Sequence, residues 1–188
     1  MIVSVRGTSG SGKSTLARRL MARALPLFED GRLVGYQCRS FRLVGVYPDD
    51  GRAVAGVDIL NRVRRRRDAL FDQIARWAAL GNVFYEGLLV SNEVSRTVAL
   101  AKQYPSLVLV LTTPLATCRE QATLRRSSPG LSLFGDEVAS EALRSDRDKI
   151  GEMFREVQSA VRRLEAAGVA VEQLDWDSAL VRCQELLK

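Results

Sequence analysis

Two spacings of apolar residues alternate along the chain. Short apolar runs favour strands, and they are separated by longer segments whose apolar residues recur every three or four positions, as on one face of a helix. The runs predict strands at residues 2–5, 33–38, 41–47, 82–85, 107–111 and 169–174. The helical spacing predicts helices at residues 13–25, 61–80, 92–103, 115–126, 137–167 and 177–187. Buried strands that alternate with helices are typical of a parallel sheet covered on both faces, so we expect an α/β fold.

Glycine and proline mark the ends of most of these elements. Pro26 is expected to end the first helix, and residues 28–31 have the composition of a turn. The strands predicted at 33–38 and 41–47 are close enough to form a hairpin. No repeat or long linker interrupts the 188 residues, so we expect a single domain over residues 1–188.

Composition removes several classes of chemistry. The absence of histidine excludes a Ser-His nucleophile pair and the H-E-x-x-H zinc site, so a general base would be a carboxylate, a lysine or a tyrosine. The net charge of +6 favours an anionic partner, either nucleotide alone or nucleic acid as well. Three widely spaced cysteines, Cys38, Cys118 and Cys183, are expected to stay reduced. With no apolar run of the ~20 residues that span a bilayer, we expect a cytoplasmic protein without a membrane partner.

Residues 7–14 carry the strongest motif of the chain. They read G-x-x-x-x-G-K-S and lie between the first predicted strand and the first predicted helix. In that context backbone N–H groups and the helix N-terminus neutralise a phosphate chain, and glycine lets the backbone approach it closely. The alternative is a glycine-serine turn that fits the pattern by chance. We predict a nucleoside triphosphate site formed by Gly7, Ser9, Gly10, Ser11, Gly12, Lys13, Ser14 and Thr15.

The motif also assigns individual roles. Lys13 is expected to reach the β- and γ-phosphates, and the Ser14 hydroxyl to hold Mg²⁺, so ATP and Mg²⁺ are the predicted cofactors. Glu86 lies where the predicted strand 82–85 ends, a position that resembles the Walker B site of P-loop proteins. There a carboxylate orients Mg²⁺ or its water, or acts as a base. The alternative for Glu86 is a charge at the N-terminus of a helix.

Asp58 is the second candidate carboxylate. It lies in a glycine-containing loop before the helix predicted at 61–80. Small-molecule P-loop kinases often have an acid that grips the acceptor in this region, and by that resemblance Asp58 would take the proton of an attacking hydroxyl. A solvated turn aspartate, or the N-cap of the next helix, fits the sequence equally well.

Arginines supply the candidate cations. Arg125 and Arg126 end a predicted helix, in a segment that resembles the lid entry of P-loop kinases, where arginines lie over the transferred phosphoryl group. Arg119 is expected to join them or to contact the nucleotide base. Helix dipoles alone also favour cations near a helix C-terminus. Weaker candidates for closing over the phosphates are Arg147 and Lys149.

The densest positive run begins at Arg62. Five arginines within six residues surround most of a helix, so not all can serve one ligand. The run predicts either a solvated basic face or a patch that contacts the phosphates of a polynucleotide or a phosphorylated acceptor. We assign nucleic-acid contact to Arg62, Arg64, Arg65 and Arg66. Trp176, after the last predicted strand, either stacks on the base of the nucleotide or covers the core.

These motifs together resemble the P-loop nucleoside and nucleotide kinase superfamily over essentially the whole chain. The resemblance implies a five-stranded parallel sheet in the order 2-3-1-4-5, with helices on both faces and a short lid at about residues 119–136. The N-K-x-D signature of GTPases is absent, and no D-x-x-G occurs at the second acidic strand. The length also argues against an ABC or AAA-type ATPase.

A closer resemblance concerns residues 45–47, 56–59 and 85–91, which look like those of phage kinases of DNA hypermodification. That family phosphorylates the hydroxymethyl group of 5-hydroxymethyluracil within DNA. The resemblance implies transfer of the γ-phosphoryl group of ATP to a hydroxyl of DNA in the host cytoplasm. A kinase of a free nucleoside or nucleotide, and a nucleotide-dependent switch without a phosphorylated substrate, remain open. The residues expected to carry the transfer are Lys13, Asp58, Glu86, Arg125 and Arg126, with Ser14 and Glu86 on the metal.

Overall fold

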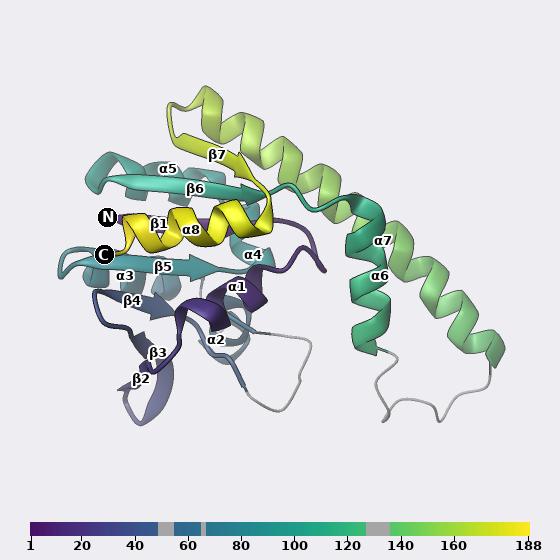
Figure 1. Ribbon diagram of the computed structural model, residues 1–188, viewed down its shortest axis with the longest axis horizontal. Coiled ribbons are helices and arrows are strands. Elements are labelled where there is room, and N and C mark those ends of the chain that lie inside the picture. Colours follow the sequence, from purple (N-terminus) through teal and green to yellow (C-terminus); the bar gives the residue numbers. More distant parts are fainter. Residues whose placement is uncertain (49–54, 65–66, 127–135) are drawn as a thin grey trace.

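The computed structural model describes the backbone of residues 1–48, 55–64, 67–126 and 136–188, and the side chains of these residues except 61–64, 67, 125–126 and 136–148. Strands and helices alternate through most of the chain (Figure 1). The strands are β1 (Ile2–Arg6), β2 (Leu25–Glu29), β3 (Arg32–Gln37), β4 (Phe41–Val44), β5 (Asn82–Glu86), β6 (Ser106–Leu111) and β7 (Ala170–Leu174). The helices are α1 (Lys13–Leu20), α2 (Val57–Arg64), α3 (Arg67–Ala78), α4 (Leu88–Ser91), α5 (Val94–Gln103), α6 (Leu115–Arg126), α7 (Asp136–Ala166) and α8 (Trp176–Leu186).

The described strands form one sheet of seven strands, in the order β2-β3-β4-β5-β1-β6-β7. The prediction of five strands in a purely parallel sheet was therefore wrong. The five strands from β4 to β7 in this order are parallel to their neighbours, and numbered among themselves they follow the predicted order 2-3-1-4-5. The two further strands, β2 and β3, extend the sheet antiparallel at the β4 edge.

The added hairpin explains where the sequence misled. The helix predicted for 13–25 ends at Leu20, and Pro26, expected to stop a helix, lies inside β2. β2 is the edge strand of the sheet, where proline is tolerated because one side of the strand needs no ladder hydrogen bonds. Asp30 and Gly31 both have positive φ, 50° and 71°, and form the tight turn to β3. The predicted hairpin between 33–38 and 41–47 is confirmed as β3 and β4.

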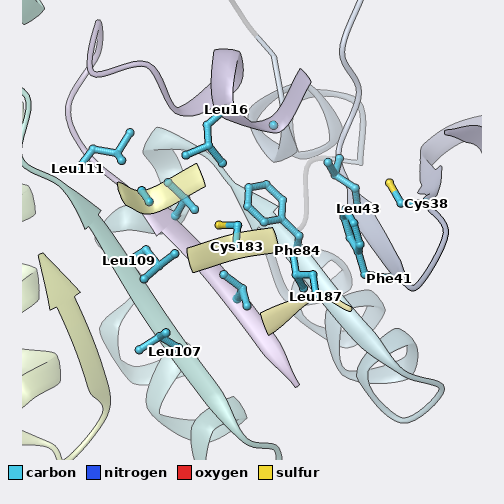
Figure 2. Close-up of a cluster of buried hydrophobic side chains, with 14 of the residues drawn as sticks. Leu16, Cys38, Phe41, Leu43, Phe84, Leu107, Leu109, Leu111, Cys183 and Leu187 are labelled. Atoms are coloured by element: carbon cyan, nitrogen blue, oxygen red, sulfur yellow. The ribbon is translucent and has the colours of Figure 1, made fainter. Parts of the chain in front are cut away.

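Helices cover both faces of the sheet, as expected. On one face α1 and α8 pack on strand residues such as Phe84 and Leu109, with Leu16 from α1 and Cys183 from α8 in the same buried cluster (Figure 2). On the other face α3 packs against β5, and α5 and α7 pack against β6. The central strands β1, β5 and β6 are thus buried on both faces, which leaves the edges of the sheet and the strand ends for function.

Two further boundaries differ from the prediction. The helix expected at 61–80 begins at Val57, and α2 and α3 take its place. Residues 127–135 of the predicted lid lie outside the described residues. Its remaining residues belong to the end of α6 and the start of α7. Cys38, Cys118 and Cys183 are buried and free of disulfides, as predicted. Among the described residues, no helix combines the length and apolar character needed to cross a bilayer.

Candidate active site

The phosphate loop joins the end of β1 to the start of α1. Gly10 and Gly12 adopt positive φ, 86° and 94°, which a residue with a side chain rarely does. A Cβ atom at Gly10 would lie 2.1 Å from the carbonyl oxygen of Cys118 on α6, so the loop also needs glycine there for space. The loop is held from outside as well, because the Thr113 hydroxyl donates to the Ser11 carbonyl at 2.9 Å. The pattern seen in the sequence therefore has the local geometry that it requires.

Lys13 is folded back over this loop. Its ammonium donates to the carbonyl oxygens of Gly7 and Thr8, at 2.8 and 2.9 Å, and the side chain is 7% exposed. Nearby, the Ser11 hydroxyl is buried and has no hydrogen-bond partner among the described residues. A buried cation and a buried unpartnered hydroxyl on a loop of this shape fit a bound phosphate chain, which accepts hydrogen bonds from both.

Ser14 and Glu86 meet beside the loop. The Ser14 hydroxyl donates to Glu86 Oε1 at 3.1 Å. The meeting follows from the sheet, because β5 lies parallel to β1 and pairs Glu86 with Val5, next to the start of the loop. Glu86 is buried, and this burial, aided by the nearby Asp58 carboxylate, raises its pKa to about 7 against the opposing effect of Lys13.

The same pair fits a magnesium ion. Mg²⁺ is commonly held by one or two carboxylate or hydroxyl oxygens together with phosphate oxygens of the nucleotide. Ser14 and Glu86 supply two such oxygens next to the loop. In the part of the chain that the structure describes, no cluster of three His, Cys, Asp or Glu residues could hold a metal by itself. A metal at Ser14 and Glu86 would take its remaining ligands from phosphate oxygens and water.

Asp58 binds the start of α4. Its two carboxylate oxygens accept hydrogen bonds from the backbone N–H groups of Leu88 and Leu89, at 2.8 and 3.1 Å. A Cβ atom at Gly87 would lie 2.7 Å from Asp58 Oδ1, so the chain passes very close to this carboxylate. The sequence left open a capping role for Asp58. The structure gives it that geometry toward α4, thirty residues further along the chain.

Trp176 packs on the phosphate loop. Its Nε1 donates to the carbonyl oxygen of Gly12 at 3.2 Å, and a Cβ atom at Gly12 would lie 2.9 Å from the indole ring. The half-buried ring also packs against the cluster between the sheet, α1 and α8. Of the two roles that the sequence left open, this contact corresponds to covering the core, and stacking on the nucleotide base remains a prediction.

Comparison with known proteins agrees with this site. A family model described as an AAA domain matches residues 2–157. A relative named "5-hmdU DNA kinase", from Pseudomonas phage PaMx11, is 31% identical over 205 residues, which cover 100% of this chain and 97% of the relative. The chain belongs to this P-loop NTPase family. The resemblance drawn from the motifs is thereby confirmed, whereas the argument from length against an AAA-type domain was wrong.

Arg6 is a buried residue of this P-loop NTPase that the sequence did not single out. It is fully buried at the end of β1, and burial lowers the pKa of its guanidinium. Nη1 donates to the Ser91 carbonyl at the end of α4, and Nη2 donates to the Thr97 hydroxyl at 2.6 Å. Asp58 and Arg6 thus hold opposite ends of α4, the segment directly after Glu86. In the sequence, the position of Arg6 at the end of an apolar strand could have pointed to this role.

Tyr47 is the other residue that was missed. It is buried beside Glu86, and burial, with the neighbouring Glu86 carboxylate, raises the pKa of its hydroxyl well above the ordinary value. The guanidinium of Arg18 lies 5.9 Å from the centre of the ring. Tyr47 and Glu86 are buried and Asp58 is half-buried, and the three form one polar group beside Ser14.

The remaining predicted residues divide into two groups. Ser9 is half-buried in the loop, and Thr15 is exposed on the first turn of α1. Arg119 lies half-buried on α6, with its side chain toward α7. Side chains outside the described residues are those of Arg62, Arg64, Arg65, Arg66, Arg125, Arg126 and Arg147. The roles of both groups stay predictions.

Proposed function

We propose that this P-loop NTPase is an ATP-dependent kinase that transfers the γ-phosphoryl group to a hydroxyl. The observation that carries the proposal is the Ser14–Glu86 pair at 3.1 Å, directly beside the phosphate loop. Hydroxyl and carboxylate oxygens suit Mg²⁺, and a metal at this position would lie against the phosphates that the loop binds. Kinases need this combination, because most of their catalysis comes from positioning the phosphoryl group and neutralising its charge.

In this proposal the acceptor oxygen attacks the γ-phosphorus while the bond to the β–γ bridging oxygen breaks, and ADP leaves. Lys13 exchanges the carbonyls of Gly7 and Thr8 for phosphate oxygens. Bound Mg²⁺ would supply further positive charge on the phosphates. Asp58, whose carboxylate lies near Glu86 and at the start of α4, receives the proton of the acceptor as a general base. Arg125 and Arg126 close over the transferred group.

The acceptor that we propose is the hydroxymethyl group of 5-hydroxymethyluracil in DNA. The name of the relative from phage PaMx11, which aligns with the whole chain, supports this acceptor. The net charge of +6 also supports a polyanionic substrate, since the nucleotide alone would not need such an excess. Contacts from Arg62, Arg64, Arg65 and Arg66 to DNA phosphates belong to the same proposal.

The experiment is incubation with γ-labelled ATP and Mg²⁺ in the presence of different acceptors. The acceptors are unmodified DNA, DNA that contains 5-hydroxymethyluracil, and a panel of free nucleosides and nucleotides. We expect label only in the hydroxymethylated DNA, with Lys13→Ala protein as the inactive control. Label in a free nucleoside would show that the acceptor is a small molecule and would refute DNA as the acceptor. ADP release without any labelled acceptor would refute the kinase and favour a nucleotide-dependent switch.

Salt provides an independent check on the acceptor. Lys and Arg contacts to several DNA phosphates release counterions, so affinity falls steeply as salt rises. We expect the apparent affinity for hydroxymethylated DNA to fall by at least about tenfold between 50 and 200 mM salt. An affinity that is insensitive to salt would contradict a DNA-binding role for the arginine run.

A further inference from the structure

Gly151 lies inside the long helix α7. A glycine in the interior of a helix is unfavourable relative to alanine, because it loses more backbone freedom on folding. Gly151 is buried, and it stands where α7 turns one side toward α6. The two helices lie beside each other at one end of the molecule (Figure 1). A buried glycine in this place calls for a reason other than helix stability.

The side chain of Arg119 supplies the reason. A Cβ atom at position 151 would lie 3.1 Å from Arg119 Nη2, closer than side chains normally pack. The guanidinium of Arg119 therefore passes over α7 where α7 has no side chain. Its Nε is buried and has no hydrogen-bond partner within the described part of the chain. This Nε is a donor that an anion bound at the loop would satisfy.

Both helices touch the phosphate loop at this level. Cys118, the residue before Arg119, places its carbonyl against Gly10. Ile150, the residue before Gly151, accepts a hydrogen bond from the Thr8 hydroxyl at 3.4 Å. The side chains of Cys118 and Ile150 also belong to one buried cluster. The packing that holds Arg119 against Gly151 is thus built directly onto the loop that binds phosphate in the proposed function.

We propose that Gly151 is a positioning residue for the nucleotide and acts through Arg119. By leaving a space on α7, it lets the Arg119 guanidinium lie between α6 and α7 and donate to the phosphates of a nucleoside triphosphate. The inference rests on the proposed function, since it needs a nucleotide on the loop. It adds that the identity of residue 151 sets nucleotide affinity, although residue 151 itself contacts no ligand.

The test measures binding of a non-hydrolysable ATP analogue with Mg²⁺ by titration calorimetry, with no acceptor present. The variants are Gly151→Ala, Gly151→Leu, Arg119→Met and the two corresponding double variants. We expect Arg119→Met to weaken binding by about tenfold, as the loss of charge-assisted hydrogen bonds would. Gly151→Leu should weaken it by a similar factor and Gly151→Ala by less, because a methyl group displaces the guanidinium by only a few tenths of an ångström.

The double variants separate positioning from general damage. If Gly151 acts through Arg119, its replacement should cause no further loss of affinity in the Arg119→Met protein. The melting temperature of Gly151→Ala should equal or exceed that of the wild type, since alanine favours the helix. Ser159→Ala, on the exposed side of α7, is the control, with a smaller gain in helix propensity and unchanged affinity.

Two results would overturn the inference. One is wild-type affinity in both Gly151 variants, and the other is an equal loss of affinity with and without Arg119. If either result came from a protein whose wild type binds the analogue and labels an acceptor, the proposed function would stand and only the role of Gly151 would fall. A wild type that fails to bind the analogue would overturn both.

Discussion

Replacing Glu86 with glutamine should stabilise the ligand-free protein at alkaline pH while it removes activity. Glutamine keeps the shape of the side chain and an oxygen for the Ser14 hydroxyl, and replaces the other carboxylate oxygen by a neutral NH₂ group. Burial raises the pKa of Glu86 from 4.5 to about 7. Since each pH unit corresponds to about 1.4 kcal/mol, ionised Glu86 lowers the free energy of unfolding by roughly 3 kcal/mol above pH 7.

The sign of this effect depends on pH. A raised pKa means that the folded protein binds the proton more tightly, so the stabilisation by protonated Glu86 is full below pH 4.5 and is lost as the pH rises through 7. The glutamine side chain does not titrate, so the variant keeps this stabilisation at every pH. At pH 8 we therefore expect the variant to be about 3 kcal/mol more stable, or roughly 6 to 12 °C higher in melting temperature. Near pH 4.5 the difference should fall below about 1 kcal/mol.

The assay is urea denaturation of both proteins at the two pH values, with transfer of label from γ-labelled ATP measured in parallel. Glu172→Gln is the control, because Glu172 is paired with Arg182 at 2.7 Å and its pKa is lowered by that hydrogen bond. The control should not gain stability at pH 8. Burial of the charged carboxylate would be refuted as the cause if Glu86→Gln gained no stability at pH 8 or gained the same stability at both pH values. Either result would show that burial of the ionised carboxylate does not lower the stability of the wild type.

Three further substitutions address other parts of the site. Lys13→Ala should lower phosphoryl transfer by at least about a hundredfold with an unchanged circular dichroism spectrum, and near-normal turnover would contradict the mechanism. Asp58→Asn should lower turnover by about 10²- to 10⁴-fold with little change in ATP affinity. Equal losses of turnover and of ATP affinity would contradict a role as general base and indicate that Asp58 acts by holding the start of α4. Gly10→Ala should destabilise the fold by at least about 1–3 kcal/mol in urea denaturation, because its φ of 86° and the Cys118 carbonyl exclude a side chain; wild-type stability would contradict the loop geometry.

Local features of the chain were predictable because neighbouring residues decide them. The phosphate loop depends on glycines at fixed spacing between a strand and a helix, and residues 7–14 have that arrangement in the structure. The helix predicted at 115–126 is α6 with the same ends. The order of the parallel strands followed from the family resemblance. The β2–β3 hairpin was missed, because Pro26 ends a helix and lies in an edge strand equally well.

The contacts within the site were decided by the tertiary structure. Arg6 binds Ser91 and Thr97, 85 and 91 residues away, and Trp176 binds Gly12 across 164 residues. Spacing along the chain holds no information about such pairs, because the packing of helices on the sheet brings them together. The sequence therefore determined which residues suit phosphate and magnesium. Only the folded chain decided that Asp58 would hold α4 and that Gly151 would leave space for Arg119.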